Sequence, residues 1–223
     1  LIGNSEISLQ ASNNLTMNDR SNEFAFLDSK AQNERLFYIK TIEALDMIAM
    51  GQNVDTTLIS PELIEDPLDA HLLYVRWTLD TLAPHEESLK KCLITTLEQS
   101  TRRFVHEKRY FDDLRYLKLW VLYARQCSKA GAIKIYEYLN SKTIGIEFSM
   151  LYEEWANAIE QDQADPQKVE QIFDLGIQRE AQPLTRLKKK KLLVLKRMSE
   201  TKLLAQETTS GQTQNLQSKL SDS

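Results

Sequence analysis

The stretch RRFVHEKRYFDDLRYLKLWVLYA, residues 102–124, is dense in aromatic and charged side chains and carries the strongest helix signal of the chain. Over residues 114–124, Arg115 and Lys118 are the only charged side chains. An apolar surface around nearly the whole circumference is typical of a helix that is buried between neighbours. The stretch therefore predicts a helix over about 113–128 that forms the centre of a helical stack.

The acidic pair at the start of this helix has two interpretations. Asp112 and Asp113 resemble a pair of catalytic carboxylates, but adjacent residues of a helix point about 100° apart. Asp112 at the N-cap, with Asp113 in the first turn, would instead satisfy free amides and complement the helix dipole. Phe111 and Tyr116 flank this cap as a hydrophobic staple would. We therefore expect capping rather than catalysis here.

Apolar residues at three- and four-residue spacing continue on both sides of the stretch. Asp66-Pro67 predicts a helix start, with Asp66 as the N-cap and Pro67 at the first helical position. Pro84 ends that helix, since proline is not tolerated in a helix interior. Further helices are expected at about 86–106, 130–141, 147–161, 166–181 and 183–204.

The two ends of the chain differ in composition from its middle. Residues 1–33 are rich in Asn, Ser and Asp, and we expect them to form a flexible polar tail, as we do residues 205–223. Residues 34–51 are expected to form an N-terminal helix, which a loop connects to a helical domain over residues 66–204.

The helices recur with a regular period. Those starting near Asp113, Glu147 and Pro183 follow one another at intervals of about 35 residues, and Trp120 and Trp155 share this interval. Such spacing is typical of tetratricopeptide-like repeats, in which each helical hairpin buries one face against the next. We predict an all-α fold, a tetratricopeptide-like right-handed stack of about seven to eight helices. The small residues of a regular tetratricopeptide unit are mostly missing, so a regular array is not expected.

Composition limits the classes of partner. The 223 residues are 42% hydrophobic with a net charge of -4, so the chain offers no general attraction to nucleic acid or to an acidic membrane. Cys92 and Cys127 are the only cysteines, which is typical of a reduced nuclear or cytosolic protein. No stretch of the sequence is long and apolar enough to predict a membrane span.

No motif of a catalytic, cofactor or metal site is present in the sequence. His71, His85 and His106 lack the spacing of metal ligands to one another and to the two cysteines. Phosphate-binding and kinase motifs are absent, and the adjacent acids Glu153 and Glu154 diverge on a helix as the earlier pair does. We expect no catalytic residues, no cofactor and no metal in this chain.

A basic segment near the C-terminal end has two interpretations. Residues 186–191 include five Lys or Arg residues, and Lys196 and Arg197 follow. This positive charge could bind phosphates, but no aromatic side chain is interleaved for stacking on bases. The alternative, which we prefer, is a capping helix with one solvated face and one packed face. The packed face would comprise Leu184, Leu187, Leu192, Leu195 and Met198.

Four blocks of the sequence carry a resemblance to a known family. They are DPLDAHLLYVRWT (66–78), LITTLEQSTRRFVHEKRYFDDLRYLKLWVLYA (93–124), YEYLNSKTIGIEFSMLYEEWANAIE (136–160) and IFDLGIQREAQPLTRL (172–187). In this order they resemble the N-terminal region of the Bub/Mad spindle-checkpoint family. The resemblance covers residues 66–200 or so and implies a tetratricopeptide-like module without enzymatic activity of its own.

The resemblance implies two possible roles at the kinetochore of mitotic chromosomes in the nucleus. Kinase-type members use this region to dock short helical motifs of a kinetochore scaffold protein, and any kinase domain lies elsewhere in the parent chain. Mad-type members use it, together with a Lys-Glu-Asn box, to hold and block the activator of the anaphase-promoting complex. This sequence contains no Lys-Glu-Asn tripeptide, which favours the kinase-type role.

The resemblance also implies where a partner would dock. The scaffold-docking edge of the family corresponds here to Tyr123, Cys127 and Lys134. Tyr123 fits the aromatic that the family commonly has at this position. Cys127 and Lys134 depart from the residue types of vertebrate members, and the segment between them is longer. The alternative for Tyr123 is a further buried aromatic of the core.

Overall fold

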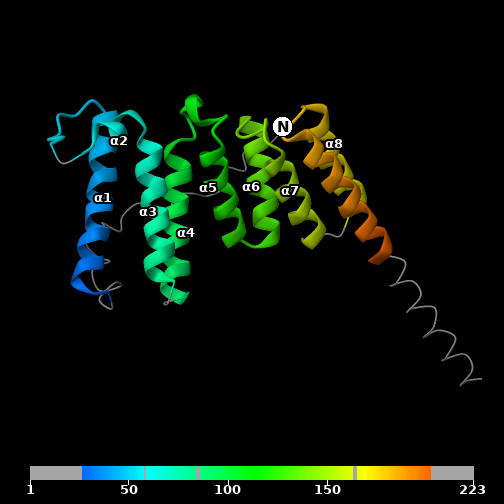
Figure 1. Cartoon of the computed structure of the whole chain (residues 1–223), viewed down its shortest axis with the longest axis horizontal. Coiled ribbons are helices and arrows are strands. Elements are labelled where there is room, and N and C mark those ends of the chain that lie inside the picture. Colours follow the sequence, from blue (N-terminus) through cyan, green and yellow to red (C-terminus); the bar gives the residue numbers. More distant parts are fainter. Residues whose placement is uncertain (1–26, 58, 84–85, 163–164, 202–223) are drawn as a thin grey trace, which may run out of the picture. The chain divides into compact units, whose positions relative to one another are not determined.

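The computed structural model describes residues 27–57, 59–83, 86–162 and 165–201 (Figure 1). Within these ranges no residue belongs to a β-strand, and Phe148 and Gln182 form an isolated parallel bridge. The predicted all-α class is therefore confirmed. The helices are α1 (Ser29–Ala49), α2 (Pro61–Glu65), α3 (Pro67–Leu82), α4 (Glu86–Arg103), α5 (Leu114–Gln126), α6 (Lys129–Lys142), α7 (Ser149–Asp162) and α8 (Pro166–Gln178), with a 3-10 turn, η2, at Lys108–Tyr110. Residues 184–201 are also helical.

The first helix begins earlier than its apolar pattern predicts. Asp28 is the N-cap of α1, and its side chain accepts a hydrogen bond of 2.7 Å from the backbone N–H of Ala31. Residues 29–33, which we expected in the polar tail, are thus helical because a capping residue precedes them. Residues 1–26 of the first predicted tail and all of the second, residues 205–223, lie outside the described residues, as do residues 202–204 at the end of the last predicted helix.

The segment expected as a loop after α1 contains the short helix α2. Pro61 occupies its first position after Ser60, and Glu62 lies in its first turn. Both are favourable at a helix start, because the ring of proline presets the backbone and an acid complements the dipole. The prediction of a loop to Glu65 was wrong over these five residues, since the short segment has no apolar period to reveal it.

The chain divides into two compact units, Leu1–Leu93 and Ile94–Ser223, and the boundary falls inside α4. In the first unit α1 and α2 pack against α3. Tyr38 of α1 stacks on Tyr74 of α3, with ring centroids 5.9 Å apart, and Trp77 donates its indole N–H to Glu34 at 3.0 Å. The core of this unit comprises Leu27, Ile39, Tyr74, Trp77, Leu82 and Cys92.

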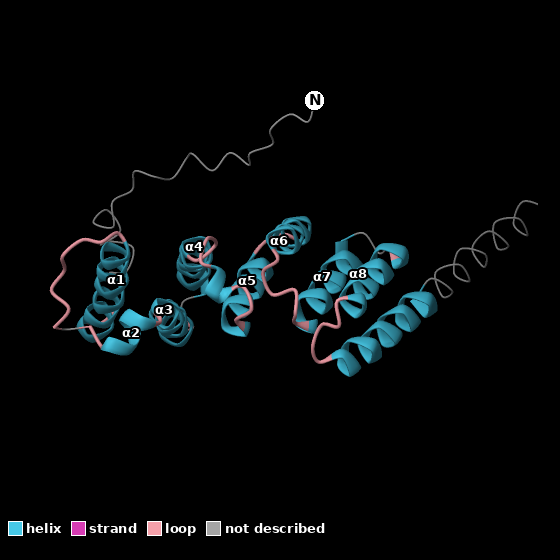
Figure 2. Cartoon of the chain, turned by 90° about the horizontal axis from the view of Figure 1, so that it is seen from above, coloured by secondary structure: helices cyan, strands magenta, loops and turns pink. Residues whose placement is uncertain are grey.

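In the second unit α5, α6, α7 and α8 follow one another, and each packs against the next (Figure 2). The N-cap of α5 is Asp113, and the expectation that Asp112 caps this helix was wrong by one residue. The Asp113 carboxylate accepts from the backbone N–H of Arg115 at 2.7 Å and from its guanidinium at 2.6 Å. Partial burial opposes ionisation, but these hydrogen bonds outweigh it and lower the pKa of Asp113.

The predicted staple across the start of α5 was also wrong, because the cap lies one residue later. Phe111 instead accepts a hydrogen bond of 2.8 Å at its backbone carbonyl from the N–H of Gly145, which follows α6. Tyr116 is fully buried, and its hydroxyl donates to the carbonyl of Thr101 in α4 at 2.6 Å. Burial raises the pKa of Tyr116, so it remains a neutral donor at physiological pH.

The contact between α7 and α8 depends on Gly176. A Cβ atom added at this position would lie 2.5 Å from Cγ of Tyr152 in α7, closer than real side chains approach. Tyr152 is fully buried, and its hydroxyl donates to the carbonyl of Ile146 at 2.9 Å. The absence of a side chain at Gly176 therefore lets the two helices meet around this ring.

The helix over residues 184–201 packs through Leu187, Val194 and Met198, which are buried. Leu184 and Leu195 are partly buried, as expected for a packed face. The prediction was wrong for Leu192, which is 71% exposed. Leu192 stands about 140° around the helix from Leu187, so the same helix cannot present both to one neighbour.

Candidate docking edge

Tyr123 lies in the last turn of α5 and is only partly buried. Its ring meets the buried ring of Trp120 edge-on, with centroids 6.2 Å apart. Trp120 also contacts Tyr138 of α6, with centroids 5.8 Å apart. Tyr123 and Tyr138 therefore both contact a buried tryptophan and are themselves at least partly accessible. Tyr123 is thus not a fully buried aromatic of the core, and its role in docking stays a prediction.

Cys127 caps the C-terminal end of α5, and its backbone N–H donates to the carbonyl of Ala124 at 3.1 Å. Burial, aided by the negative charge of Glu98, raises the pKa of its thiol. Burial and Glu98 also raise the pKa of the nearby Tyr123. Both groups are therefore neutral at physiological pH, and Cys127 lacks the thiolate that a nucleophile or metal ligand requires.

Lys134 is exposed on α6, one helical turn before Tyr138. Lys142 follows one turn after Tyr138, and its ammonium lies 5.9 Å from the centre of the Tyr138 ring. Residues four apart share one face of a helix, so α6 presents Lys, Tyr and Lys along a single stripe. We call Tyr123, Cys127, Lys134, Tyr138 and Lys142 the docking edge.

Two of these five residues were not predicted from the sequence. Tyr138 and Lys142 belong to the edge because α6 packs beside α5, and their spacing after Lys134 was the signal that could have found them. Arg102 of α4 contributes positive charge near both Tyr123 and Tyr138, and it forms an ion pair with Glu98. The edge thus combines accessible aromatic rings with basic side chains.

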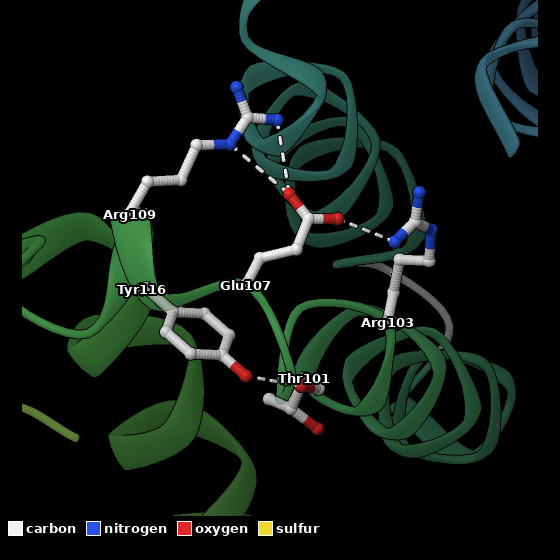
Figure 3. A network of polar contacts seen from close by, with 5 residues as sticks. All are labelled: Thr101, Arg103, Glu107, Arg109 and Tyr116. Carbon is white, nitrogen blue, oxygen red and sulfur yellow. Dashed lines mark hydrogen bonds and ion pairs between the residues drawn. The ribbon is translucent and has the colours of Figure 1, made fainter. Parts of the chain in front are cut away.

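A polar network fixes the corner between α4 and α5 (Figure 3). Glu107 accepts from Arg103 at 2.6 Å and from Arg109 at 3.1 Å, while Tyr116 donates to Thr101. The guanidinium of Arg109 also lies 4.6 Å from the centre of the Tyr110 ring. These contacts hold the end of α4 next to the start of α5. Because Arg102 belongs to the same turn of α4, they also help to fix its position relative to Tyr123.

A small cavity opens on the other side of α6. Its lining includes Cys127, Arg125, Tyr136 and Glu154, and Arg125 donates to Glu154 at 2.7 Å. Its volume of about 40 Å³ accommodates a water molecule rather than an organic ligand. Tyr136 stands about 200° around α6 from Lys134, so on α6 the cavity and the docking edge occupy different faces, and Cys127 at the end of α5 is a residue that both include.

The acids that could have formed a catalytic pair have separate structural partners. Glu153 is buried and accepts from Arg186 at 2.9 Å, whereas Glu154 pairs with Arg125 of α5. Among the described residues no three His, Cys, Asp or Glu side chains are grouped so that they could hold a metal ion. No helix in this part of the chain is both long and apolar enough to span a membrane.

Comparison with known proteins identifies the fold and the family. The family model described as Mad3/BUB1 homology region 1 matches residues 49–177. The mitotic spindle checkpoint component mad3 of Schizosaccharomyces pombe is 32% identical over 151 residues, which are 68% of this chain and 47% of that protein. The mitotic checkpoint serine/threonine-protein kinase BUB1 beta of Homo sapiens is 33% identical over 142 residues, 64% of this chain and 13% of that protein. The chain therefore spans less than half the length of these relatives.

Two solved structures share the fold. The crystal structure of the conserved N-terminal domain of the mitotic checkpoint component BUB1 superposes with a TM-score of 0.65 over 78% of this chain and 83% of that chain, at 22% identity. A chain of the crystal structure of the Mitotic Checkpoint Complex gives a TM-score of 0.61 over 85% of this chain and 75% of that chain, at 28% identity. The predicted tetratricopeptide-like fold is thereby confirmed, and the matched region is a non-catalytic helical domain that contains no kinase domain.

Proposed function

Since this chain belongs to the Mad3/BUB1 homology region 1 family, we propose that it is the docking module of a mitotic spindle assembly checkpoint protein. It binds short helical motifs of a kinetochore scaffold protein and so recruits the checkpoint protein to the kinetochores of mitotic chromosomes in the nucleus. The relatives named as checkpoint components and the four sequence blocks that carry the resemblance support this role.

The observation that carries the proposal is the accessible ring of Tyr123 on its rigid support. Trp120 is buried beneath it, and Tyr138 and Lys134 extend the surface along α6. Partly exposed aromatic residues on a fixed base are the usual hot spots of protein interfaces. An amphipathic helical motif can place an apolar side chain against Tyr123 and Tyr138, and its acidic residues near Lys134 and Lys142.

Titration of a labelled kinetochore-scaffold peptide into the full chain tests this proposal. Tyr123→Ala removes the ring that a partner would contact, and we expect affinity to fall about tenfold or more. Tyr123→Phe keeps the ring and loses only the hydroxyl, so it should bind within about twofold of the original chain. The alanine variant, in contrast, loses the apolar contact that the ring makes. Gln178→Ala changes an exposed residue of α8 and serves as the surface control.

Thermal melts of each variant separate a binding defect from unfolding. Tyr123→Ala should melt close to the original chain, because only part of the side chain is buried. If a folded Tyr123→Ala protein binds the peptide as tightly as the original chain does, the docking edge is not the scaffold site.

The second candidate function is inhibition of the anaphase-promoting complex through its activator subunit. It is favoured by the 32% identity to mad3 and by the likeness to a chain of the Mitotic Checkpoint Complex structure. We prefer scaffold docking because the sequence holds no Lys-Glu-Asn tripeptide. Parallel titrations with the scaffold peptide and with purified activator distinguish the two. Tight activator binding without scaffold binding would reverse our preference.

A further inference from the structure

The helix over residues 184–201 presents an outer face that neither the fold nor the docking edge uses. Lys189 and Lys196 lie two helical turns apart at the middle of this face, and Leu192 and Leu193 lie on either side of them. All four are exposed, Leu192 at 71% and Leu193 at 54%. We call these four residues the Lys/Leu face. It points away from Leu187, Val194 and Met198, which bury the opposite side of the helix.

The basic residues along the edges of the same helix are engaged with α7 and α8. Arg186 donates to Glu153 at 2.9 Å, and Arg197 donates through Nε to Glu160 at 3.0 Å. Lys191 contacts Asp174 at 2.7 Å and Glu170 at 3.0 Å. These acids hold the helix in place and neutralise Arg186, Lys191 and Arg197. The basic segment therefore divides into cations that attach the helix and cations that face outward.

The outward cations concentrate positive charge on a chain whose net charge is -4. Lys188, Lys189 and Lys190 are exposed, and Lys196 is exposed with a 3.8 Å contact to Glu200. Exposed ion pairs of this kind are weak and readily exchanged. The Lys/Leu face thus combines positively charged side chains with two leucines that are accessible to a partner. A helix that is only solvated would be expected to expose charged side chains without such apolar ones.

We propose that the Lys/Leu face binds an acidic amphipathic helical segment of a partner protein. Leu192 and Leu193 would pack against the apolar stripe of the segment, and its Asp and Glu residues would pair with Lys189, Lys196 and their neighbours. A second copy of this chain is a poor occupant, since a two-fold pairing would oppose lysine to lysine. Single-stranded nucleic acid is poorly matched, since leucines offer no stacking surface.

Fluorescence anisotropy with a labelled model peptide tests the proposal on the full 223-residue chain. The peptide consists of Leu and Glu residues. Successive Leu residues are spaced alternately three and four positions apart, so that they line one face of an acidic amphipathic helix. The K189E/K196E variant should bind about tenfold more weakly or worse, because two attractions become repulsions. The L192S/L193S variant should lose a similar factor, because it removes the apolar contact. K108E/K118E makes the same charge change at exposed sites of η2 and α5 and should bind like the original chain.

Comparison probes decide among the possible ligands. The proposal requires that a peptide of the same composition in scrambled order binds at least about tenfold more weakly, since only the ordered one has an apolar stripe. It is overturned if the scrambled peptide binds equally, or if K189E/K196E binds as the original chain does. It is also overturned if an oligo(dT) strand or a phosphatidylserine vesicle binds more tightly than the ordered peptide and shows the same dependence on Lys189 and Lys196. Circular dichroism of each variant confirms that the helical fold is retained.

Discussion

At Gly176, α8 approaches Tyr152 so closely that a methyl group has no room. The neighbouring atoms belong to the ring of Tyr152 and to Leu187, both of them fully buried. Neither can move aside without disturbing the packing of its own helix. Close-packed interiors transmit such displacements, so the identity of this one residue controls the fit of three helices.

Substitution of Gly176 tests this dependence. Gly176→Ala should destabilise the fold by about 1–3 kcal/mol, because overpacking outweighs the gain in helix propensity. Gly131→Ala is the control, since its new methyl group would approach no atom closer than the hydroxyl of Ser128, at 3.1 Å, and the Cβ of Cys127, at 3.3 Å. Urea denaturation followed by circular dichroism measures both. Equal midpoints for the two variants would contradict the role assigned to Gly176.

Single residues also show what the sequence could and could not predict about the site. Tyr123 was proposed as a site residue from the family resemblance, but its half-buried state could not be predicted, because burial depends on the position of Trp120 and α6. Leu192 looked like a core residue because its spacing from Leu195 fits a helical face. The packing of the helix over residues 184–201 against α7 and α8 shows that its buried face is instead centred on Leu187, Val194 and Met198.

At the scale of one element, the start of α5 depends on which of two adjacent acids caps it. Both Asp112 and Asp113 suit the position by residue type. In the structure Asp113 takes this position: its carbonyl accepts the first helical hydrogen bond from the N–H of Leu117 at 3.1 Å, and its own N–H closes the preceding turn on the carbonyl of Tyr110 at 3.1 Å. The backbone hydrogen bonds of this turn therefore decide a boundary that residue type leaves open.

Alanine at each acid tests the assignment. Asp113→Ala should cost about 1–2 kcal/mol near neutral pH, and Asp112→Ala, which removes an exposed side chain, about 0.5 kcal/mol or less. The pKa of Asp113 is lowered from 3.8 in the folded state, so its ionised form stabilises the fold fully above pH 3.8. This contribution is lost as the pH falls from there through the folded pKa, so the difference between Asp113→Ala and the original chain should shrink. Denaturation at several pH values measures the free energy of unfolding of each variant. A larger loss of this free energy in Asp112→Ala than in Asp113→Ala would contradict the assignment.

At the scale of the whole molecule, the helical class and most helix positions were predictable, because each buried helix carries an apolar period that local residues define. The division of the chain inside α4 was not, because it follows from which helices contact one another. The family was identifiable from four separated blocks, whereas Lys142 and Arg102 entered the candidate site only through the packing of α4, α5 and α6.

The reactivity of each cysteine thiol measures how accessible its surroundings in its own unit are to solvent. Cys92 is buried in the first unit, and Cys127 is partly buried in the second. At about pH 8, Ellman's reagent should label Cys127 before Cys92, yet more slowly than a free cysteine, because burial raises its pKa and reduces the thiolate. Cys92 should react only when the core around it opens.

Cys127→Ser isolates the slower thiol and provides the control. In this variant only Cys92 reacts with Ellman's reagent, and the reaction should be slow in buffer and fast in concentrated guanidinium. The original chain should show a fast phase and a slow phase in buffer. Labelling of Cys92 in buffer at the rate of Cys127 would show that the core of the first unit is open to solvent.

The bridge between Phe148 and Gln182 has a consequence for how this fold is inherited. Ser149 donates to the carbonyl of Gln182 at 2.8 Å, and Gln182 donates to the carbonyl of Glu147 at 2.7 Å, so backbone groups alone tie the turn before α7 to the turn before the last helix. Backbone groups are the same in every residue that carries an N–H. Lineages can therefore exchange the exposed side chains at positions 147 and 182 while the joint persists, whereas Ser149 is buried and admits fewer residue types. Distant homologues would then share this backbone connection even where their amino-acid sequences no longer align.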